Sequence, residues 1–220
     1  MKLFADLEKI VKYDEPMTNH TWYKLGGPAK FYISPESHEQ LLEVTRRCHE
    51  NNIDIYVLGG GSNLLITDNG IDGAVISLDH ETFKTIEVVG DHVRVGAGVT
   101  MSSLLRETAR QGLGGMECMA GIPGTIGGAL KINAGGRFGD IGSMTCSVEL
   151  MDSSGYRFGW QSDELYFGYR MSNITARFIL GAELKLTKDD PDHIGQMIKE
   201  VWMLKKSSQP METRNAGCVF

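Results

Sequence analysis

Hydrophobic residues recur at helical and strand periods in turn along this chain, and the pattern predicts an α+β fold. Residues 35–51 are predicted to form a helix, because Ser34 is a good N-cap and Pro35 suits the first helical position. Residues 53–58 and 74–78 are short apolar runs typical of strands, separated by a glycine-rich turn. The apolar stripe of the predicted helix consists of Leu41, Leu42, Thr45 and Cys48.

The middle of the chain is rich in strand patterns. Residues 85–89 and 92–98 are predicted to pair and to turn at Gly90 and Asp91. Thr100 is a suitable cap for a helix over residues 101–111, which Gly112 closes. We also expect a hairpin of residues 146–151 and 156–160, and a strand within residues 174–186.

A last helix is predicted for residues 191–206, with Asp190 as its cap, and residues 216–220 resemble the start of a strand. We therefore divide the chain into an α/β unit (1–79), an α+β unit (80–187) and the opening of a third domain (188–220). The apolar stripe of the last helix is expected to pack against that third domain. It consists of Ile194, Met197, Ile198, Val201 and Leu204.

Composition narrows the functional classes. The net charge of −6 gives no support for a nucleic-acid-binding face or a polybasic membrane anchor, so an anionic ligand would have to be held by backbone N–H groups. Glycine is enriched, with 27 residues in the chain, most of them between Gly59 and Gly142. A folded segment with so many glycines usually contains tight turns or approaches a ligand closely with its backbone.

Cysteine and histidine spacings do not indicate a metal or redox motif. The four cysteines form no CxxC pair, and the six histidines show no ligand spacing. The N-terminus is too charged for a signal peptide, and the uncharged stretch 118–130 is too short to span a bilayer. These features predict a soluble cytoplasmic protein that binds neither nucleic acid nor membrane and holds no metal.

Two glycine loops are the strongest candidate binding elements. The loop at 59–63 lacks the G-x-G-x-x-G of a dinucleotide-binding turn, so it is either a tight turn between strands or a phosphate cradle. The loop at 121–128 is stiffened by Pro123 and is either a buried turn or a flat surface for a planar ligand. Because both loops occur in one chain, we expect one large ligand with a phosphate and a ring.

Ordered motifs along nearly the whole chain resemble the UDP-N-acetylenolpyruvoylglucosamine reductase family of flavoenzymes. Each motif alone is moderately specific, whereas the ordered set is highly specific. The motifs are residues 19–29 (NHTWYKLGGPA), 57–65 (VLGGGSNLL), 96–98 (GAG), 121–129 (GIPGTIGGA), 133–135 (NAG), 167–172 (FGYRMS) and 215–220 (NAGCVF).

The resemblance implies an FAD-binding fold of two subdomains, of the vanillyl-alcohol-oxidase/PCMH type, followed by a substrate-binding domain. The first glycine loop would hold the pyrophosphate of non-covalently bound FAD, and the second would line the flavin. The residues implied in FAD binding are Leu58, Gly59, Gly60, Gly61, Ser62, Asn63, Leu64, Gly121, Ile122, Pro123, Gly124, Thr125, Gly127, Gly128, Asn133 and Ala134.

The reaction implied by the resemblance is reduction of UDP-N-acetylglucosamine enolpyruvate to UDP-N-acetylmuramate, a peptidoglycan precursor, with NADPH as hydride donor. Arg170, beside Tyr169, would stabilise the enolate, and Cys218 would protonate C2 in place of the serine of other members. The family continues beyond this last motif with most of the substrate domain and a late glutamate. The alternatives are an FAD-binding fragment without turnover, or another flavin oxidoreductase of the same fold.

Overall fold

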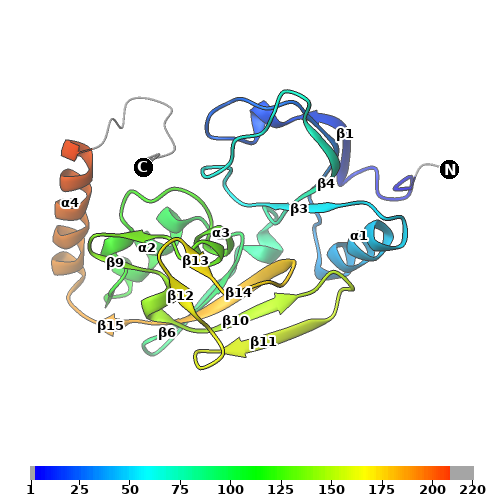
Figure 1. Cartoon of the computed structure of the whole chain (residues 1–220). Helices are drawn as coiled ribbons and strands as arrows, with labels where there is room; N and C mark the ends of the chain where they lie inside the picture. The colour runs from blue at the N-terminus through cyan, green and yellow to red at the C-terminus, as the bar shows by residue number, and fades with distance from the viewer. Residues whose placement is uncertain (1–2, 209–220) are drawn as a thin grey trace.

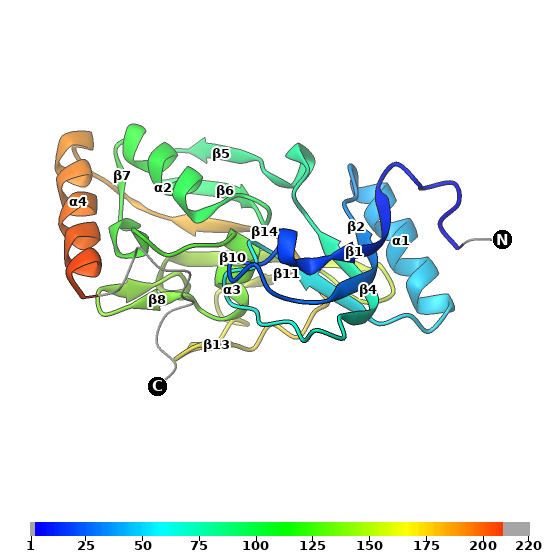
Figure 2. The same ribbon diagram turned by 90° about the horizontal axis from the view of Figure 1, so that it is seen from above.

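The computed structural model describes residues 3–208 and contains two main β-sheets, one after the other along the chain. The first sheet lies within residues 11–77 and the second within residues 86–185. In Figure 1 the strands of the first sheet lie at the upper right and those of the second below them. The last helix stands at the opposite edge of the molecule from the first helix, and Figure 2 shows the same separation from above.

The first sheet has four strands in the order β1-β2-β4-β3. Strand β2 runs parallel to β4, and β4 runs parallel to β3, whereas β1 is antiparallel to β2. The first glycine loop begins where β3 ends. The strands are β1 (Val11–Pro16), β2 (Pro28–Ile33), β3 (Ile55–Leu58) and β4 (Ile71–Ser77).

The first helix, α1 (His38–Glu50), begins later than its sequence predicts. Ser37 is the N-cap, and its hydroxyl accepts a hydrogen bond from the Gln40 N–H at 3.2 Å, so the prediction that Ser34 caps this helix is wrong. Leu42 is exposed, and Val44 takes its expected place in the core. The buried residues Leu41, Val44, Thr45 and Cys48 follow the i, i+3, i+4, i+7 spacing of one helix face, whereas Leu42 lies about 100° around the helix from Leu41.

The second sheet has five antiparallel strands in the order β11-β10-β14-β6-β5. Both predicted hairpins are present, and the pairing of Met151 with Arg157 places the turn between them. The strands are β5 (Ile86–Val89), β6 (His92–Gly96), β10 (Thr145–Met151), β11 (Arg157–Gln161) and β14 (Phe178–Lys185).

Helices and small strand pairs complete the second half. The helices are α2 (Met101–Arg110), α3 (Ile126–Lys131) and α4 (Pro191–Ser208), with short 3₁₀ turns η1 (Met17–Asn19), η2 (Glu81–Phe83), η3 (Glu117–Met119) and η4 (Gly142–Met144). The two-residue strands are β7 (Leu113–Gly114), β8 (Gly135–Gly136), β9 (Gly139–Asp140), β12 (Phe167–Gly168), β13 (Met171–Ser172) and β15 (Thr187–Lys188). Helix α3 begins within the second glycine loop.

Helix α4 packs against the second half of the described chain, on η3, α2 and β7. Ile194 and Val201 are buried there, whereas Met197 and Leu204 are exposed. The prediction that the whole stripe waits for a third domain is therefore wrong for its buried members. Positions i and i+7 of a helix lie on one face, and η3 and β7 cover the face of Ile194 and Val201.

One continuous hydrophobic core joins the two sheets, since Ile33 and Ile76 of the first belong to the same buried cluster as Val148 and Leu184 of the second. The Arg177 guanidinium adds a polar link, donating to the Ile55 carbonyl oxygen at 2.9 Å. The two halves are therefore fixed relative to each other, so loops from both can form one site. Among the described residues, no helix is long and apolar enough to cross a membrane.

Candidate cofactor site

The first glycine loop leaves strand β3 at Leu58, which is buried at the strand end. Gly61 has φ +63°, and a Cβ there would lie 2.0 Å from the His20 carbonyl oxygen. The Gly61 carbonyl in turn accepts a hydrogen bond from the Trp22 N–H at 3.0 Å. The 19–29 motif therefore buttresses this loop. This supporting role could not be predicted from the motif, because it depends on a contact between residues about 40 positions apart.

The second glycine loop is fixed by backbone hydrogen bonds to the segment that precedes α2. The Gly124 carbonyl accepts from Met101 N–H at 3.0 Å, and the Ile126 and Gly127 N–H groups donate to Val99 and Ala97 at 2.9 Å. A Cβ on Gly127 would lie 3.0 Å from the Ala97 Cβ. This loop needs glycine for close backbone packing, and its shape is held from outside the loop.

The two loops contact each other directly. A Cβ added to Gly59 would lie 2.6 Å from the Thr125 Oγ1, and one added to Gly60 would lie 2.8 Å from the Gly124 Cα. Loops that are separated by about 60 residues in sequence therefore form one continuous backbone surface. The expectation of a single ligand that contacts both loops is consistent with this arrangement.

Several backbone N–H groups in the joined loops have no partner within residues 3–208. The N–H groups of residues 60–63, and those of Gly124 and Thr125, donate no hydrogen bond to another described residue. Gly59, Gly60 and Asn63 are exposed, so these groups border solvent. Clustered N–H donors beside glycines can bind phosphate oxygens without any cationic side chain.

Tyr169 and Arg170 form the two-residue loop of the β12–β13 hairpin, in which Gly168 pairs with Met171. Tyr169 is 91% exposed, and the Arg170 guanidinium carbon lies 5.5 Å from its ring centroid. Arg170 has φ +57°, a left-handed conformation that arginine rarely adopts, and its Nη1 donates to the Gly135 carbonyl at 2.9 Å. Such strain in an exposed loop is typical of functional sites.

Asn133 connects this hairpin to the end of the second glycine segment. The side chain is 5% exposed; its Nδ2 donates to the Gly168 carbonyl at 3.0 Å, and its Oδ1 accepts from Gly142 N–H at 3.0 Å. Both ends of the Asn133 amide are therefore bonded within the protein, and they hold the hairpin in place. The neighbouring Ala134 is buried as well. The same contacts place the Tyr169–Arg170 loop near Gly135.

The remaining predicted site residues lie in the two loops or beyond residue 208, outside the described part of the chain. Ser62, Asn63 and Leu64 lie in the first loop, and Ile122, Pro123 and Gly128 lie in the second, none of them fully buried. Cys218 lies outside the described residues. Cys48 is fully buried in α1, and its burial raises the pKa of this thiol to about 11, as expected of a core residue.

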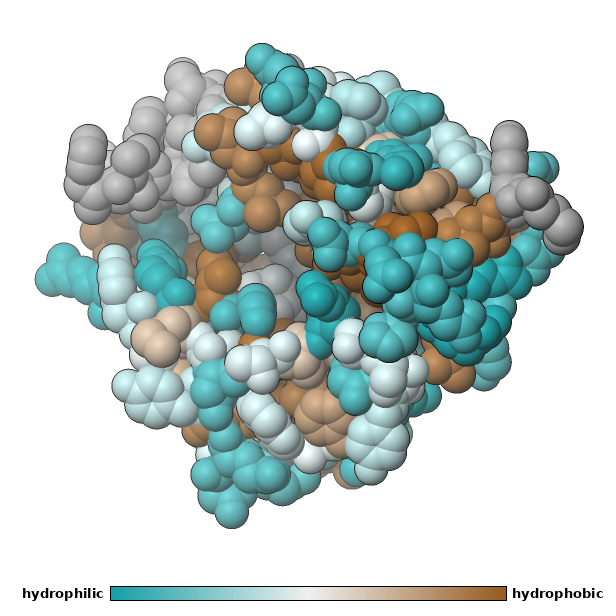
Figure 3. Space-filling view, turned by 45° about the vertical axis from the view of Figure 1, so that its right-hand side comes forward, coloured by the Kyte–Doolittle hydropathy of each residue, from teal (hydrophilic) through white to brown (hydrophobic). Residues whose placement is uncertain are grey.

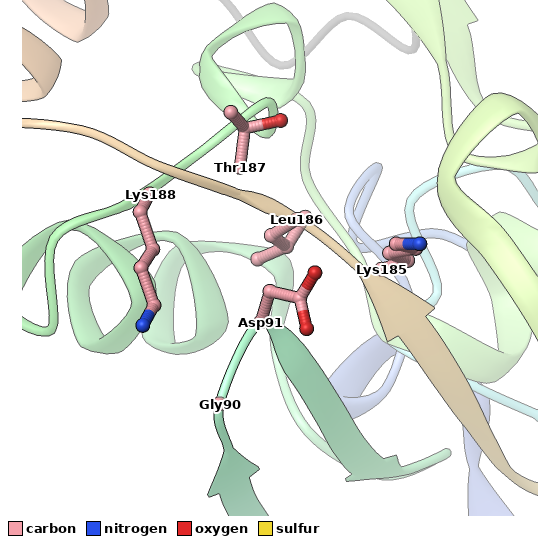
Figure 4. Close-up of a pocket in the computed structure, with 6 residues that line it drawn as sticks. All are labelled: Gly90, Asp91, Lys185, Leu186, Thr187 and Lys188. Atoms are coloured by element: carbon pink, nitrogen blue, oxygen red, sulfur yellow. The ribbon is translucent and has the colours of Figure 1, made fainter.

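A separate cavity of about 430 Å³ lies away from the glycine loops, between the β5–β6 turn and residues 185–188. Figure 4 shows the Lys185 and Lys188 side chains extending to different sides of Asp91 instead of converging on one point. This arrangement lacks the convergent polar groups of a catalytic site. The face in Figure 3 is hollowed near its centre, with hydrophobic and hydrophilic residues interleaved around the rim.

The site fits a dinucleotide cofactor with a planar ring. The free N–H groups at 60–63 suit a pyrophosphate. In the segment Gly121–Gly124, Ile122 packs against the hydrophobic core, and the two glycines leave backbone accessible beside Pro123. No group of three or more metal-ligating side chains occurs within the described part of the chain. The fold and this site define an FAD-binding protein, and a family model for an FAD binding domain matches residues 29–158.

Similarity to known proteins identifies the family within the FAD-binding proteins. The UDP-N-acetylenolpyruvoylglucosamine reductase of Clostridium tetani is 39% identical over 212 residues, covering 96% of this chain and 68% of that protein. The same-named protein of Clostridioides difficile is 36% identical, with 96% and 69% covered. The chain therefore belongs to the UDP-N-acetylenolpyruvoylglucosamine reductase family, as the ordered motifs predict.

Solved structures support the same assignment. The crystal structure of UDP-N-acetylenolpyruvylglucosamine reductase from Thermus caldophilus superposes with a TM-score of 0.81 at 34% identity, covering 96% of this chain and 73% of that one. A solvent-stable cholesterol oxidase superposes with a TM-score of 0.61 at 17% identity over 76% of this chain and 36% of its own. The predicted fold of the vanillyl-alcohol-oxidase/PCMH type is confirmed.

Proposed function

We propose that the chain, as part of a cytoplasmic enzyme, reduces UDP-N-acetylglucosamine enolpyruvate to UDP-N-acetylmuramate for peptidoglycan synthesis, with FAD as cofactor and NADPH as donor. One observation carries the proposal: loops from both halves of the fold form a single backbone surface with free N–H groups, and the segment that follows the second loop is bonded to the strained Arg170 hairpin. Residues 1–79 and 80–187 would contribute the two halves of the FAD site, and residues 188–220 would lead towards a substrate-binding domain.

When bound, FAD supplies the hydride transfer from NADPH to the enolpyruvyl double bond. The N–H groups of residues 60–63 would bind its phosphates, and the backbone of Gly121–Gly124 would orient its ring. The close contact between Gly60 and Gly124 would hold the phosphate-binding loop and the ring-binding loop at a fixed distance from each other. Leu58, buried at the end of β3, would anchor the first loop to the sheet.

Arg170 is proposed to act on the substrate carboxylate. Hydride addition at C3 generates negative charge on that carboxylate, and a guanidinium donates two parallel hydrogen bonds to it. Nη1 of Arg170 bonds the Gly135 carbonyl, which leaves its other nitrogens available among the described residues. The Tyr169 ring, against the guanidinium, would restrict its orientation.

Cys218 is proposed to donate the proton that C2 requires. A thiol with an ordinary pKa near 8.5 is protonated at neutral pH and can therefore act as a general acid. This proposal rests on the position of Cys218 in the family motif at 215–220.

Rapid-mixing absorbance measurements of the flavin test the proposed function. We expect the purified chain to bind FAD, NADPH to bleach the flavin absorbance, and UDP-N-acetylglucosamine enolpyruvate to restore it. Binding and bleaching without restoration by this substrate would identify an FAD-binding fragment without turnover. Restoration by a different acceptor only would identify another flavin oxidoreductase, and a chain that never binds FAD would overturn the proposal.

A further inference from the structure

Helix α4 contacts the segment that leads into the second glycine loop. The Lys205 ammonium donates to the carbonyl oxygens of Cys118 at 3.1 Å and of Ala120 at 2.5 Å. Both carbonyls lie at the end of η3, immediately before Gly121. A cationic side chain thus caps the C-terminal carbonyls of this turn, a favourable arrangement of charge and dipole.

One turn earlier on α4, Trp202 packs on Gly121 itself. A Cβ at Gly121 would lie 2.8 Å from two carbons of the Trp202 ring, and Gly121 has φ +74°. The ring therefore occupies the space that a side chain at this position would need. Trp202 and Lys205, three residues apart on one face of the helix, contact consecutive parts of the same segment.

The environment of Lys205 is costly for a charged group. The side chain is partly buried, and this burial lowers the pKa of its ammonium. An apolar side chain would carry no such desolvation cost, and the two carbonyl contacts offset part of it. The helix end is thereby tied to the backbone that precedes the loop.

We propose that Lys205, assisted by Trp202, is a positioning residue of the cofactor site. By fixing the carbonyls of Cys118 and Ala120, it holds the loop that starts at Gly121 in the shape that presents the Gly124 and Thr125 N–H groups. The stiff ring of Pro123 transmits this restraint along the loop. The inference rests on the proposed function in one respect, namely that FAD is the ligand of these loops.

Three variants of the whole chain test this role by fluorescence titration with FAD. Lys205→Met removes the ammonium while keeping the side-chain length, and we expect the FAD dissociation constant to rise about tenfold or more, since charge-assisted hydrogen bonds are strong. Lys205→Arg retains cationic donors and should restore affinity to within about threefold of the parent. Lys206→Met removes a neighbouring charge on the exposed side of α4 and should leave the affinity unchanged.

Hydrogen exchange of the parent chain tests the role of Lys205 without any substitution. Coupling between two sites is reciprocal, so FAD must slow amide exchange in residues 202–206 as well as in the loop. Unchanged exchange in α4, or an unchanged dissociation constant in Lys205→Met, would overturn the role of Lys205 while leaving FAD binding intact. Equal losses in Lys205→Met and Lys206→Met would also overturn it, and a parent chain that never binds FAD would overturn the proposed function as well.

Discussion

Gly60 and Gly124 approach each other so closely that a Cβ added to Gly60 would lie 2.8 Å from the Cα of Gly124. These residues belong to different glycine loops and to different halves of the fold. Their contact explains why neither loop can be understood as a simple turn. A side chain at Gly60 has to displace the facing backbone, which is itself tied to Met101 by the Gly124 carbonyl.

Gly60→Ala should therefore separate the loops and weaken FAD binding. We expect the dissociation constant to rise at least about tenfold, equivalent to about 1.4 kcal/mol, in a fluorescence titration. Gly195→Ala is the matched control, because a Cβ at Gly195 in α4 meets nothing within 4 Å. The control should keep its FAD affinity and gain about 0.5–1 kcal/mol of unfolding free energy. Parental affinity in Gly60→Ala would show that the loops tolerate separation.

Substitution of Arg170 should affect two properties separately, the rate of flavin reoxidation and the stability of the hairpin. Arg170→Ala and Arg170→Gly should both slow reoxidation of the reduced flavin by substrate by about 10²–10³-fold in stopped-flow absorbance, with reduction by NADPH preserved. Because φ is +57°, glycine should be more stable here than alanine by about 0.5–1 kcal/mol in thermal unfolding. If Arg170→Ala reoxidises at the parental rate, Arg170 has no part in the reaction.

Asn133 should behave as a structural residue of the Arg170 hairpin. Asn133→Ala leaves the Gly142 N–H and the Gly168 carbonyl without their amide partner, and we expect a loss of about 1–3 kcal/mol in unfolding free energy. Chemical denaturation measures this loss, and exposed Asn69→Ala should stay within about 0.5 kcal/mol of the parent. Equal stability of the two variants would contradict the role assigned to the amide.

The ion pair between Asp6 and Arg47 should lose its contribution to stability at low pH. Two hydrogen bonds from the Arg47 guanidinium lower the pKa of Asp6 from 3.8 to about 2. A carboxyl whose pKa is lowered on folding adds stability above its unfolded pKa and loses it as pH falls towards the folded value. The difference in melting temperature between the parent and Asp6→Asn should thus be largest above about pH 4 and shrink towards pH 2. A difference independent of pH would rule out this ion pair as its source.

The proposed role of Cys218 as proton donor can be tested by substitution. In a full-length enzyme, Cys218→Ala should spare flavin reduction by NADPH and slow reoxidation by substrate, because the proposed proton donor is lost. Cys218→Ser should retain part of the activity, since its hydroxyl can also donate a proton. Stopped-flow absorbance follows both half-reactions, and an unchanged reoxidation rate in Cys218→Ala would assign the proton to another group.

Local sequence signals were sufficient for much of the fold. Thr100 caps α2 as predicted, and the β5–β6 and β10–β11 hairpins turn where glycine and aspartate mark them. These features depend on residues within one turn or one hairpin, so the sequence alone determines them. Both glycine loops and the family were likewise predictable, because their motifs are contiguous and occur in a fixed order.

Tertiary structure decided which distant segments meet. The contact of Gly60 with Gly124, the bonds of Asn133 to Gly168 and Gly142, and the capping of η3 by Lys205 join segments with no shared local pattern. The same holds for the start of α1, where Ser34 and Ser37 both precede the helix: Ser37 caps it, while the Ser34 N–H donates to the remote Ile10 carbonyl. Such choices depend on how the sheets pack together, because a contact between remote residues forms only after both have been placed by the rest of the chain.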